Sequence, residues 1–409
     1  MRPKIFIIFI SMCFLSAVSF GGNRTSPDGN STFPEKELSS AGQDSVSRNW
    51  TLNGYVTNMQ SFMFQRWDGD WISDNLSHNR LNFKWHNNSN SLNVVVEMRN
   101  RFIIGESVKN TPGYAQMFDS DNGFVKLSAN IFSGNSYVFN SKIDRAFIDY
   151  TKEKFQVRAG RQRINWGQCF TWNPNDLFNA YSFLDFDYAE KPGSDAIRLQ
   201  YYGNSTSALD FAIKLDKNRK VTSALLYRFN KWNYDIQFLG GILNEEDFVL
   251  GTGWSGNILN ASFRGEVSYF HPKKNFADTS GVFSVSLGSE YAFKNSFVLQ
   301  FEMLYRQDKS PKITSFADYY NMNLSAKNLS FTDFSIMMQG SYPVTPLFNV
   351  SLAVMYFPRL NGIFIGPNLS YSITENLDFS LIAQSFSGQF IKGQTDHFNM
   401  GFLRLKWSF

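Results

Sequence analysis

Large apolar residues alternate with small or polar residues in runs of about ten residues that recur from Trp50 to the end of the chain. In the clearest run, 283–293, large apolar side chains occupy nearly every odd position, and small or charged side chains occupy the even positions. A period of two is that of a β-strand with one apolar face and one polar face. The chain is therefore predicted to be all-β.

The connections between these runs differ in length in a regular way, which predicts how the strands are joined. About eighteen runs follow one another, an even number as in single-chain bacterial barrels. The short connections include 87–90, 152–154, 203–205, 231–232, 255–257, 294–295 and 374–376, and the long ones 67–77, 105–142, 163–193, 271–280, 308–328 and 387–397. We predict a transmembrane antiparallel β-barrel with short periplasmic turns and long extracellular loops. Pro367 lacks a backbone N–H within the run 362–373, so we expect a bulge or a late strand start there.

The two ends of the chain are consistent with export to a membrane. Residues 1–19 have the features of a signal peptide, with Arg2 and Lys4 before an apolar stretch and small residues at 17–19. Residues 20–49 are predicted to be a flexible periplasmic lead-in, and residues 50–409 the barrel. The last strand alternates apolar and charged residues and ends on Phe409, which resembles the C-terminal signature that the assembly machinery of Gram-negative outer membranes reads.

Composition narrows the class of protein further. The chain is 17% aromatic, yet its mean hydropathy is −0.28. Aromatic girdles around a polar lumen explain this combination. After residue 19, no apolar run approaches the roughly 20 residues of a membrane helix. The net charge of +4 is too small to indicate nucleic-acid binding. Without Cys13 of the signal peptide, Cys169 stands alone, so no intramolecular disulfide can form.

Charged residues on the polar phase of the strands are candidates for the lining of a pore. The candidates are Arg99, Arg101, Arg145, Arg158, Arg198, Arg264, Glu266, Glu302, Arg306 and Arg404. They could form a basic ladder that draws anionic or sugar-like solutes through a constriction. The alternative is that these charges form salt bridges that solvate and stiffen the wall of a water-filled barrel.

The long connection 163–193 is rich in aromatic residues, including Trp166 and Trp172. A loop of this length in a compact barrel is usually functional, and so much apolar surface needs something to pack on. We predict that the loop folds inward and narrows the pore. The alternative is a cap on the outer rim or a loop that binds a partner.

This part of the chain also carries a family resemblance. The order Gly160-Arg161-Gln162, Trp166-Gly167, Asn173-Pro174-x-Asp176 and Pro192-Gly193 resembles that of a group of porin-like outer-membrane proteins, and more distantly the alginate-export type of eighteen-strand barrel. The resemblance implies a diffusion or export pore. It makes Arg161, Trp166, Asn173, Pro174 and Asp176 motif positions, and together with Trp172 these are the candidate constriction-loop residues. The group often has an acidic residue after Trp-Gly, where this chain has Gln168.

The predicted function is a passive channel for small hydrophilic solutes in the Gram-negative outer membrane. Oligosaccharides, stacked on Trp166 and Trp172, and organic anions are the favoured solutes. The expected partners are outer-membrane lipid, the solute and the assembly machinery; no nucleic acid, cofactor or resident metal is expected, and the oligomeric state stays open. The main alternative is a non-conducting barrel whose loops bind a partner or polysaccharide. Weaker alternatives are a hydrolase using His78 or His271 and a cation bound at 119–123.

Overall fold

The computed structural model describes residues 48–179, 190–307, 324–330 and 332–409. Residues Arg48–Ser408 form one compact unit. The predicted signal peptide and nearly all of the predicted lead-in lie outside the described residues. The first strand begins at Trp50.

Nineteen strands form a single antiparallel sheet. The strands are β1 (Trp50–Phe64), β2 (Ile72–His86), β3 (Leu92–Gly105), β4 (Ser128–Ser133), β5 (Tyr137–Lys152), β6 (Phe155–Gln162), β7 (Ser194–Asn204), β8 (Ser207–Leu215), β9 (Val221–Lys231), β10 (Tyr234–Leu243), β11 (Asp247–Ile258), β12 (Ala261–Pro272), β13 (Val282–Ala292), β14 (Val298–Arg306), β15 (Phe334–Thr345), β16 (Phe348–Phe357), β17 (Gly362–Thr374), β18 (Leu377–Ile391) and β19 (Gln394–Ser408).

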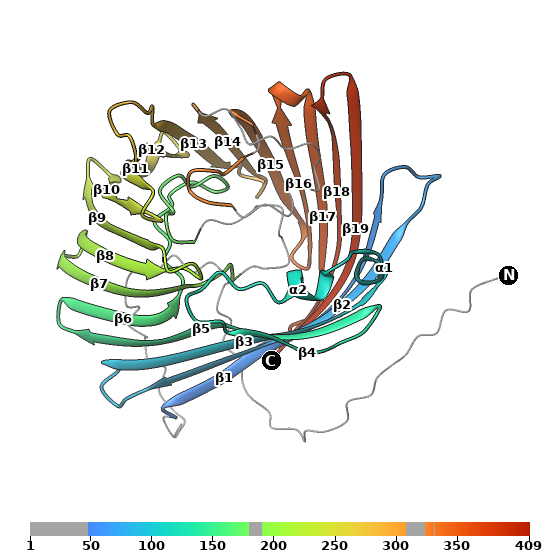
Figure 1. The fold of residues 1–409 in the computed structure, drawn as a ribbon, viewed down its shortest axis with the longest axis horizontal. Coiled ribbons are helices and arrows are strands. Elements are labelled where there is room, and N and C mark those ends of the chain that lie inside the picture. Colours follow the sequence, from blue (N-terminus) through green and yellow to red (C-terminus); the bar gives the residue numbers. More distant parts are fainter. Residues whose placement is uncertain (1–47, 180–189, 308–323, 331) are drawn as a thin grey trace. The chain divides into compact units, whose positions relative to one another are not determined.

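The sheet closes on itself, because β1 pairs with β2 on one side and with β19 on the other. Each strand pairs with the next along the chain except at β4, since β3 pairs directly with β5. The short strand β4 pairs only with the first residues of β5 and lies in line with β6, which pairs with the last residues of β5. Without β4, the nineteen strands leave a ring of eighteen (Figure 1). The predicted all-β barrel of about eighteen strands is confirmed.

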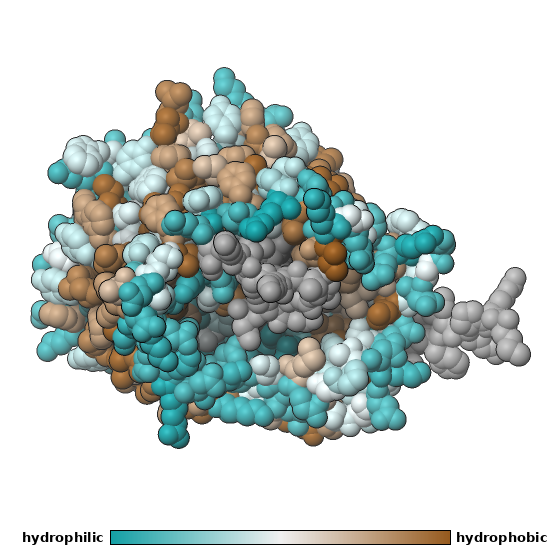
Figure 2. Space-filling view, turned by 45° about the horizontal axis from the view of Figure 1, so that its top comes forward, coloured by the Kyte–Doolittle hydropathy of each residue, from teal (hydrophilic) through white to brown (hydrophobic). Residues whose placement is uncertain are grey.

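The outer face of the ring is apolar. On β11, Leu250 is 68% exposed, whereas its neighbour Val249 points inward and is buried. The same alternation holds for Phe238 and Gln237 on β10, where the glutamine is the buried inner residue. Figure 2 shows hydrophobic residues gathered on the flank of the barrel and hydrophilic residues around its rim. A soluble monomer does not expose a continuous apolar band of this kind, so the band faces lipid.

The connections differ between the two ends of the barrel. At one end, which we call the short-turn end, every connection has between two and five residues. In the β9–β10 turn, Trp232 and Asn233 both have positive φ, as a type I′ hairpin turn requires. The other end, which we call the long-loop end, has the long connections 65–71, 106–136, 163–193, 273–281 and 307–333.

Two predicted connections are wrong. Residues 387–397 are not a long loop, because β18 and β19 extend as a hairpin to a two-residue turn after Ile391. Residues 255–257 lie within β11, and the turn follows Ile258. In both places polar residues continue the strand beyond its apolar stretch.

The predicted bulge or late strand start at Pro367 is also wrong. β17 runs from Gly362 to Thr374, and Pro367 keeps its place opposite Leu352 of β16. Gly366 and Pro367 do not pair with β18. The register of β17 with β18 is the same before and after these two residues. The missing donor is therefore accommodated by a local gap in one ladder.

Two short helices, α1 (Glu106–Asn110) and α2 (Tyr114–Phe118), lie in the connection between β3 and β4. They pack on Ile103 and Val138 of the barrel wall. A 3₁₀ turn, η1 (Pro358–Leu360), joins β16 to β17. In the part of the chain that is described, no helix is long and apolar enough to cross a membrane.

Part of the inner wall is apolar, contrary to the expectation of a uniformly hydrophilic lumen. The inward residues of β15 to β18 include Met337, Met355, Phe364 and Phe386, all of them buried. They pack with Trp172, which comes from the long connection between β6 and β7. The apolar patch therefore supports a segment that lies inside the barrel.

Candidate functional site

Residues 163–179, at the start of the β6–β7 connection, follow the inner wall of the barrel. The indole Nε1 of Trp166 donates to Asp210 Oδ2 on β8 at 3.1 Å, and Gln237 Nε2 on β10 donates to the Trp166 carbonyl at 2.7 Å. Further along, Ser268 Oγ on β12 donates to the Pro174 carbonyl at 3.0 Å. We call residues 163–179 the inner segment.

Glu266 on β12 holds the middle of the inner segment. Its Oε1 accepts hydrogen bonds from the backbone N–H groups of Gln168 and Cys169, the latter at 2.8 Å. Its Oε2 accepts the N–H of Asn175 at 2.8 Å. The carboxylate is completely buried, so three backbone donors replace its hydration.

Glu302 on β14 holds the next three residues in the same way. It accepts the N–H groups of Phe170 at 2.7 Å, Thr171 at 3.0 Å and Trp172 at 2.6 Å. The two glutamates together bind every backbone N–H from Gln168 to Trp172. Both were candidates for pore lining, and both lie beneath the inner segment.

The two tryptophans of the inner segment are buried, at 1% exposure for Trp166 and 4% for Trp172. Neither ring offers a free face to a solute, so the suggested stacking of sugars on them is wrong. Trp166 instead packs edge-on against Phe178 at a centroid distance of 4.9 Å. The aromatic residues anchor the segment to the wall.

Several residues of the resemblance motif have a structural explanation. Gly160 has a φ of +118°, and a Cβ there would lie 2.2 Å from the carbonyl oxygen of Ala146. A Cβ on Gly167 would lie 2.2 Å from Asn173 Oδ1, so this close approach also needs glycine. Asp176 is buried in the segment, and desolvation raises the pKa of its carboxyl group to about 6.

Arg161, predicted to belong to the constriction loop, lies in β6. Its buried guanidinium group donates to Asp195 on β7 at 2.6 Å and to Asp121 at 2.7 Å. Asp121 belongs to the connection before β4. Arg161 therefore ties the connection before β4 to the barrel wall at the point where β6 ends.

A second segment, residues 324–330, also contacts the inner wall. Arg306 Nη1 on β14 donates to Asn328 Oδ1 at 2.6 Å, and Lys327 Nζ pairs with Asp247 Oδ1 on β11 at 2.9 Å. Ala326 packs in the same apolar cluster as Trp166. Arg306 was a pore-lining candidate from sequence, but no sequence signal indicated the contact of Lys327 with Asp247.

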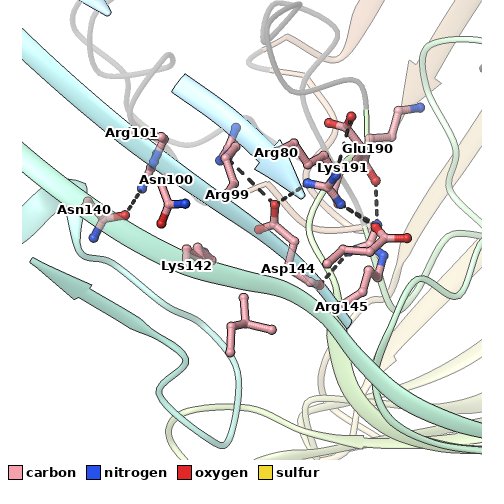
Figure 3. Close-up of polar contacts among 12 residues, drawn as sticks. Arg80, Arg99, Asn100, Arg101, Asn140, Lys142, Asp144, Arg145, Glu190 and Lys191 are labelled. Carbon is pink, nitrogen blue, oxygen red and sulfur yellow. Dashed lines mark hydrogen bonds and ion pairs between the residues drawn. The ribbon is translucent and has the colours of Figure 1, made fainter. Parts of the chain in front are cut away.

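The wall formed by β2, β3 and β5 carries a concentration of positive charge. We call Arg80, Arg99, Arg101, Lys142 and Arg145 the basic cluster (Figure 3). Arg80 pairs with Glu97 at 2.5 Å and with Asp144 at 2.6 Å. Arg145 donates to the backbone carbonyl of Glu190 at 2.6 Å, where the β6–β7 connection returns to the wall. The basic side chains of the cluster thus outnumber the carboxylates that pair with them, which are Glu97, Asp144 and Glu190.

Only three of the five residues of the basic cluster were candidates from sequence. Arg80 and Lys142 were missed, although both lie in alternating runs beside candidates that were recognised. Asp144 is buried beside Arg80 because β5 has a register shift opposite Glu97 and Met98. The extra residue turns Asp144 to the inside, which a strict period of two does not allow.

The other arginine candidates are each held by a neighbour on the wall or the inner segment. Arg158 pairs with Asp149 of β5, and Arg198 pairs with Asp210 of β8. Arg264 lies over the ring of Phe170 at 3.9 Å, and Arg404 donates to Ser380 Oγ at 3.3 Å. These contacts favour the reading of the four as wall-stiffening charges.

The candidates for other chemistry are not brought together. His78 lies on β2 beside the ring of Tyr55, whereas His271 lies on β12 and hydrogen-bonds with Tyr269. Asp121 accepts the N–H groups of Gly123 and Leu127. Searching the described ranges finds no group of three or more His, Cys, Asp or Glu side chains that could hold a metal ion.

The fold has known counterparts. The barrel is similar to the outer-membrane protein OprD of Pseudomonas aeruginosa, with a TM-score of 0.55 and 10% identity over 88% of this chain and 94% of that one. OccAB1 of Acinetobacter baumannii matches with a TM-score of 0.55 and 10% identity, over 87% of this chain and 96% of that chain. The fold is that of an outer-membrane porin. No protein-family model and no curated protein sequence matches this chain.

A third counterpart, OccK5 of Pseudomonas aeruginosa, has a TM-score of 0.55 at 9% identity and covers 88% of this chain and 98% of that one. At these identities the likeness concerns the course of the backbone. Residue roles in this chain therefore rest on its own contacts.

Proposed function

We propose that the protein is a channel in the Gram-negative outer membrane through which small hydrophilic solutes pass passively. The observation that carries this proposal is the basic cluster on the inner wall of a closed eighteen-strand barrel. A charged wall that serves only to stiffen the barrel would balance its signs, as the pairs at Arg158 and Arg198 do. The excess of positive charge on β2, β3 and β5 creates a field across the lumen.

Small organic anions are the solutes that suit this wall best. Guanidinium groups bind carboxylates and phosphates through charge-assisted hydrogen bonds. The oligosaccharide alternative depended on the rings of Trp166 and Trp172, which are buried. Arg101 and Lys142 are the partly exposed members of the basic cluster, so the pore-lining roles fall to them. Arg80, Arg99 and Arg145 are buried and contribute their charge to the field from within the wall.

The inner segment narrows the lumen and selects solutes by size in this proposal. It is held against the wall by hydrogen bonds with seven strands, β7, β8 and β10 to β14. Solutes would pass between the inner segment and the basic cluster. Flux is passive, since diffusion through such a lumen requires no nucleotide or catalytic group, and the protein is not an enzyme in this view.

The remaining partners follow from the location. The apolar outer face contacts outer-membrane lipid, and Phe409 is read by the assembly machinery during insertion.

The test is conductance in planar bilayers made with the purified protein. We expect discrete conductance steps and, under a KCl gradient, a reversal potential of the sign that indicates anion preference. Deleting residues 166–188 should enlarge the steps. A closed trace at all voltages, unchanged by the deletion, would instead support the non-conducting barrel that binds a partner through its loops.

A further inference from the structure

Glu266 and Glu302 accept hydrogen bonds from the backbone of the inner segment. A side chain that lines a pore or stiffens the wall would not need such bonds. The partners of the two glutamates are backbone N–H groups, not cations. We propose that the two glutamates are positioning residues that latch the inner segment to the wall and so set the width of the lumen. The inference rests on the proposed channel function.

The inner segment needs such a latch because residues 163–179 form no helix or strand. Its backbone N–H groups therefore lack the partners that secondary structure would supply, and buried donors without partners are costly. Five consecutive N–H groups, Gln168 to Trp172, all point to the two glutamates. Consecutive N–H groups of this kind form a concavity that suits an anion.

The chemistry of the contact requires a carboxylate. Each glutamate accepts three backbone N–H groups on two oxygens, and Glu302 accepts the hydroxyl of Ser286 as well, at 3.3 Å. Glutamine has nearly the same shape but only one acceptor oxygen, and its NH₂ group would face backbone donors. Replacing Glu by Gln thus removes the latch while the side-chain volume stays almost constant.

The chain contains its own reporter for the latch. Cys169 lies between the two contacts, donates its own N–H to Glu266, and is buried with Sγ 3.7 Å from the Ser286 carbonyl. The only other cysteine is Cys13. Burial raises the pKa of the Cys169 thiol well above its usual value, so the docked thiol is protected in two ways.

The experiment measures the rate at which fluorescein maleimide labels Cys169 in the folded, detergent-purified protein, with Cys13→Ser as the common background. We expect the variant Glu266→Gln/Glu302→Gln to label at least about tenfold faster than the parent. The matched control is Glu290→Gln on β13, whose carboxylate bonds to Gln300 of β14 at 2.5 Å. The control should label at the parent rate. Equal rates for the double variant and the parent would overturn the latch.

Folding of each variant is checked by its compact migration in SDS gels without heating. If the double variant does not fold, hydrogen exchange of the parent protein gives the answer. The amides of Gln168 to Trp172 should then exchange as slowly as those of the strands, although they belong to no strand. Rapid exchange of these amides would overturn the proposal.

Conductance separates this inference from the proposed function. If the parent conducts, the double variant should show larger or more variable conductance steps, and unchanged steps would overturn the role of the latch in setting the width. If the parent does not conduct, the channel function fails, while the labelling and exchange rates still decide whether the two glutamates hold the segment.

Discussion

Arg80 on β2 donates a hydrogen bond to Asp144 on β5 across the intervening strand β3, with Nη1 and Oδ2 2.6 Å apart. Both side chains are buried, with exposures of 1% and 0%. The contact is possible because the register shift in β5 turns Asp144 inward. The same guanidinium group also pairs with Glu97. These two ion pairs hold the guanidinium group of Arg80 inside the barrel.

Replacing Asp144 by Asn should destabilise the barrel, because the buried guanidinium group loses one of its two closest counter-charges. Since Glu97 remains, we expect a loss of about 1–3 kcal/mol in the free energy of unfolding. Urea-induced unfolding of the protein in lipid vesicles measures it. The control is Asp68→Asn, in the exposed pair with Arg66, which should change the free energy by less than about 1 kcal/mol. Equal effects of the two substitutions would contradict the assigned role of Asp144.

A charge on the outer face should prevent stable insertion if that face contacts lipid. Leu250→Arg on β11 is expected to cost about 2–4 kcal/mol, because Leu250 lies inside its strand, the fourth of twelve residues, on the outer face. The matched control is Leu259→Arg, in the turn that ends the same strand, where leucine is 95% exposed. The fraction of folded protein after refolding into vesicles measures both. If Leu259→Arg were the more harmful change, the outer face would not be the lipid face.

The strand pattern could be predicted from sequence because lipid outside a closed sheet imposes a strict period of two. Phe283 faces out and Ser284 faces in, and one such pair after another determined the approximate number of strands. The same rule failed at Asp144, since a bulge changes the phase without any signal in composition. At Met337 the period holds, but the inference that an apolar residue faces lipid fails, because Met337 packs under Trp172 inside the barrel.

The contacts of the candidate site were less predictable than the strands. Glu302 binds backbone groups about 130 positions earlier in the chain, and backbone N–H groups leave no trace in a sequence. Lys327, in the connection after β14, pairs with Asp247 on β11, which lies 80 positions earlier in the chain. The aromatic content of 163–193 indicated a need for a surface to pack on, and the described residues 163–179 have one. It did not indicate that this packing would bury the rings of Trp166 and Trp172 and leave them inaccessible to a solute.

Reversing the charge of the basic cluster should change ion selectivity. The variant Arg99→Glu/Arg101→Glu places two carboxylates on β3 where the proposed pathway carries positive charge. We expect the reversal potential under a KCl gradient to move toward cation preference, because the local field changes sign. The control is Lys152→Glu, which alters an exposed residue at the short-turn end of β5. An unchanged reversal potential in the double variant would mean that ions do not pass beside β3.

The pKa of Asp176 predicts how docking of the inner segment depends on pH. Burial raises this pKa from 3.8 to about 6, so the docked segment binds a proton that a released segment gives up. Docking is therefore strongest below about pH 4, weakens as the pH rises to about 6, and is constant above that value. Current through single channels should show more rapid fluctuation at pH 7 than at pH 4. In Asp176→Asn, which mimics the protonated group, this difference should become smaller. Asp119→Asn is the control: burial alone would raise the pKa of Asp119, but hydrogen bonds from Lys126 and Ser128 hold it below its ordinary value, so it does not titrate in this range. A pH dependence of unchanged size in Asp176→Asn would assign the fluctuation to another group.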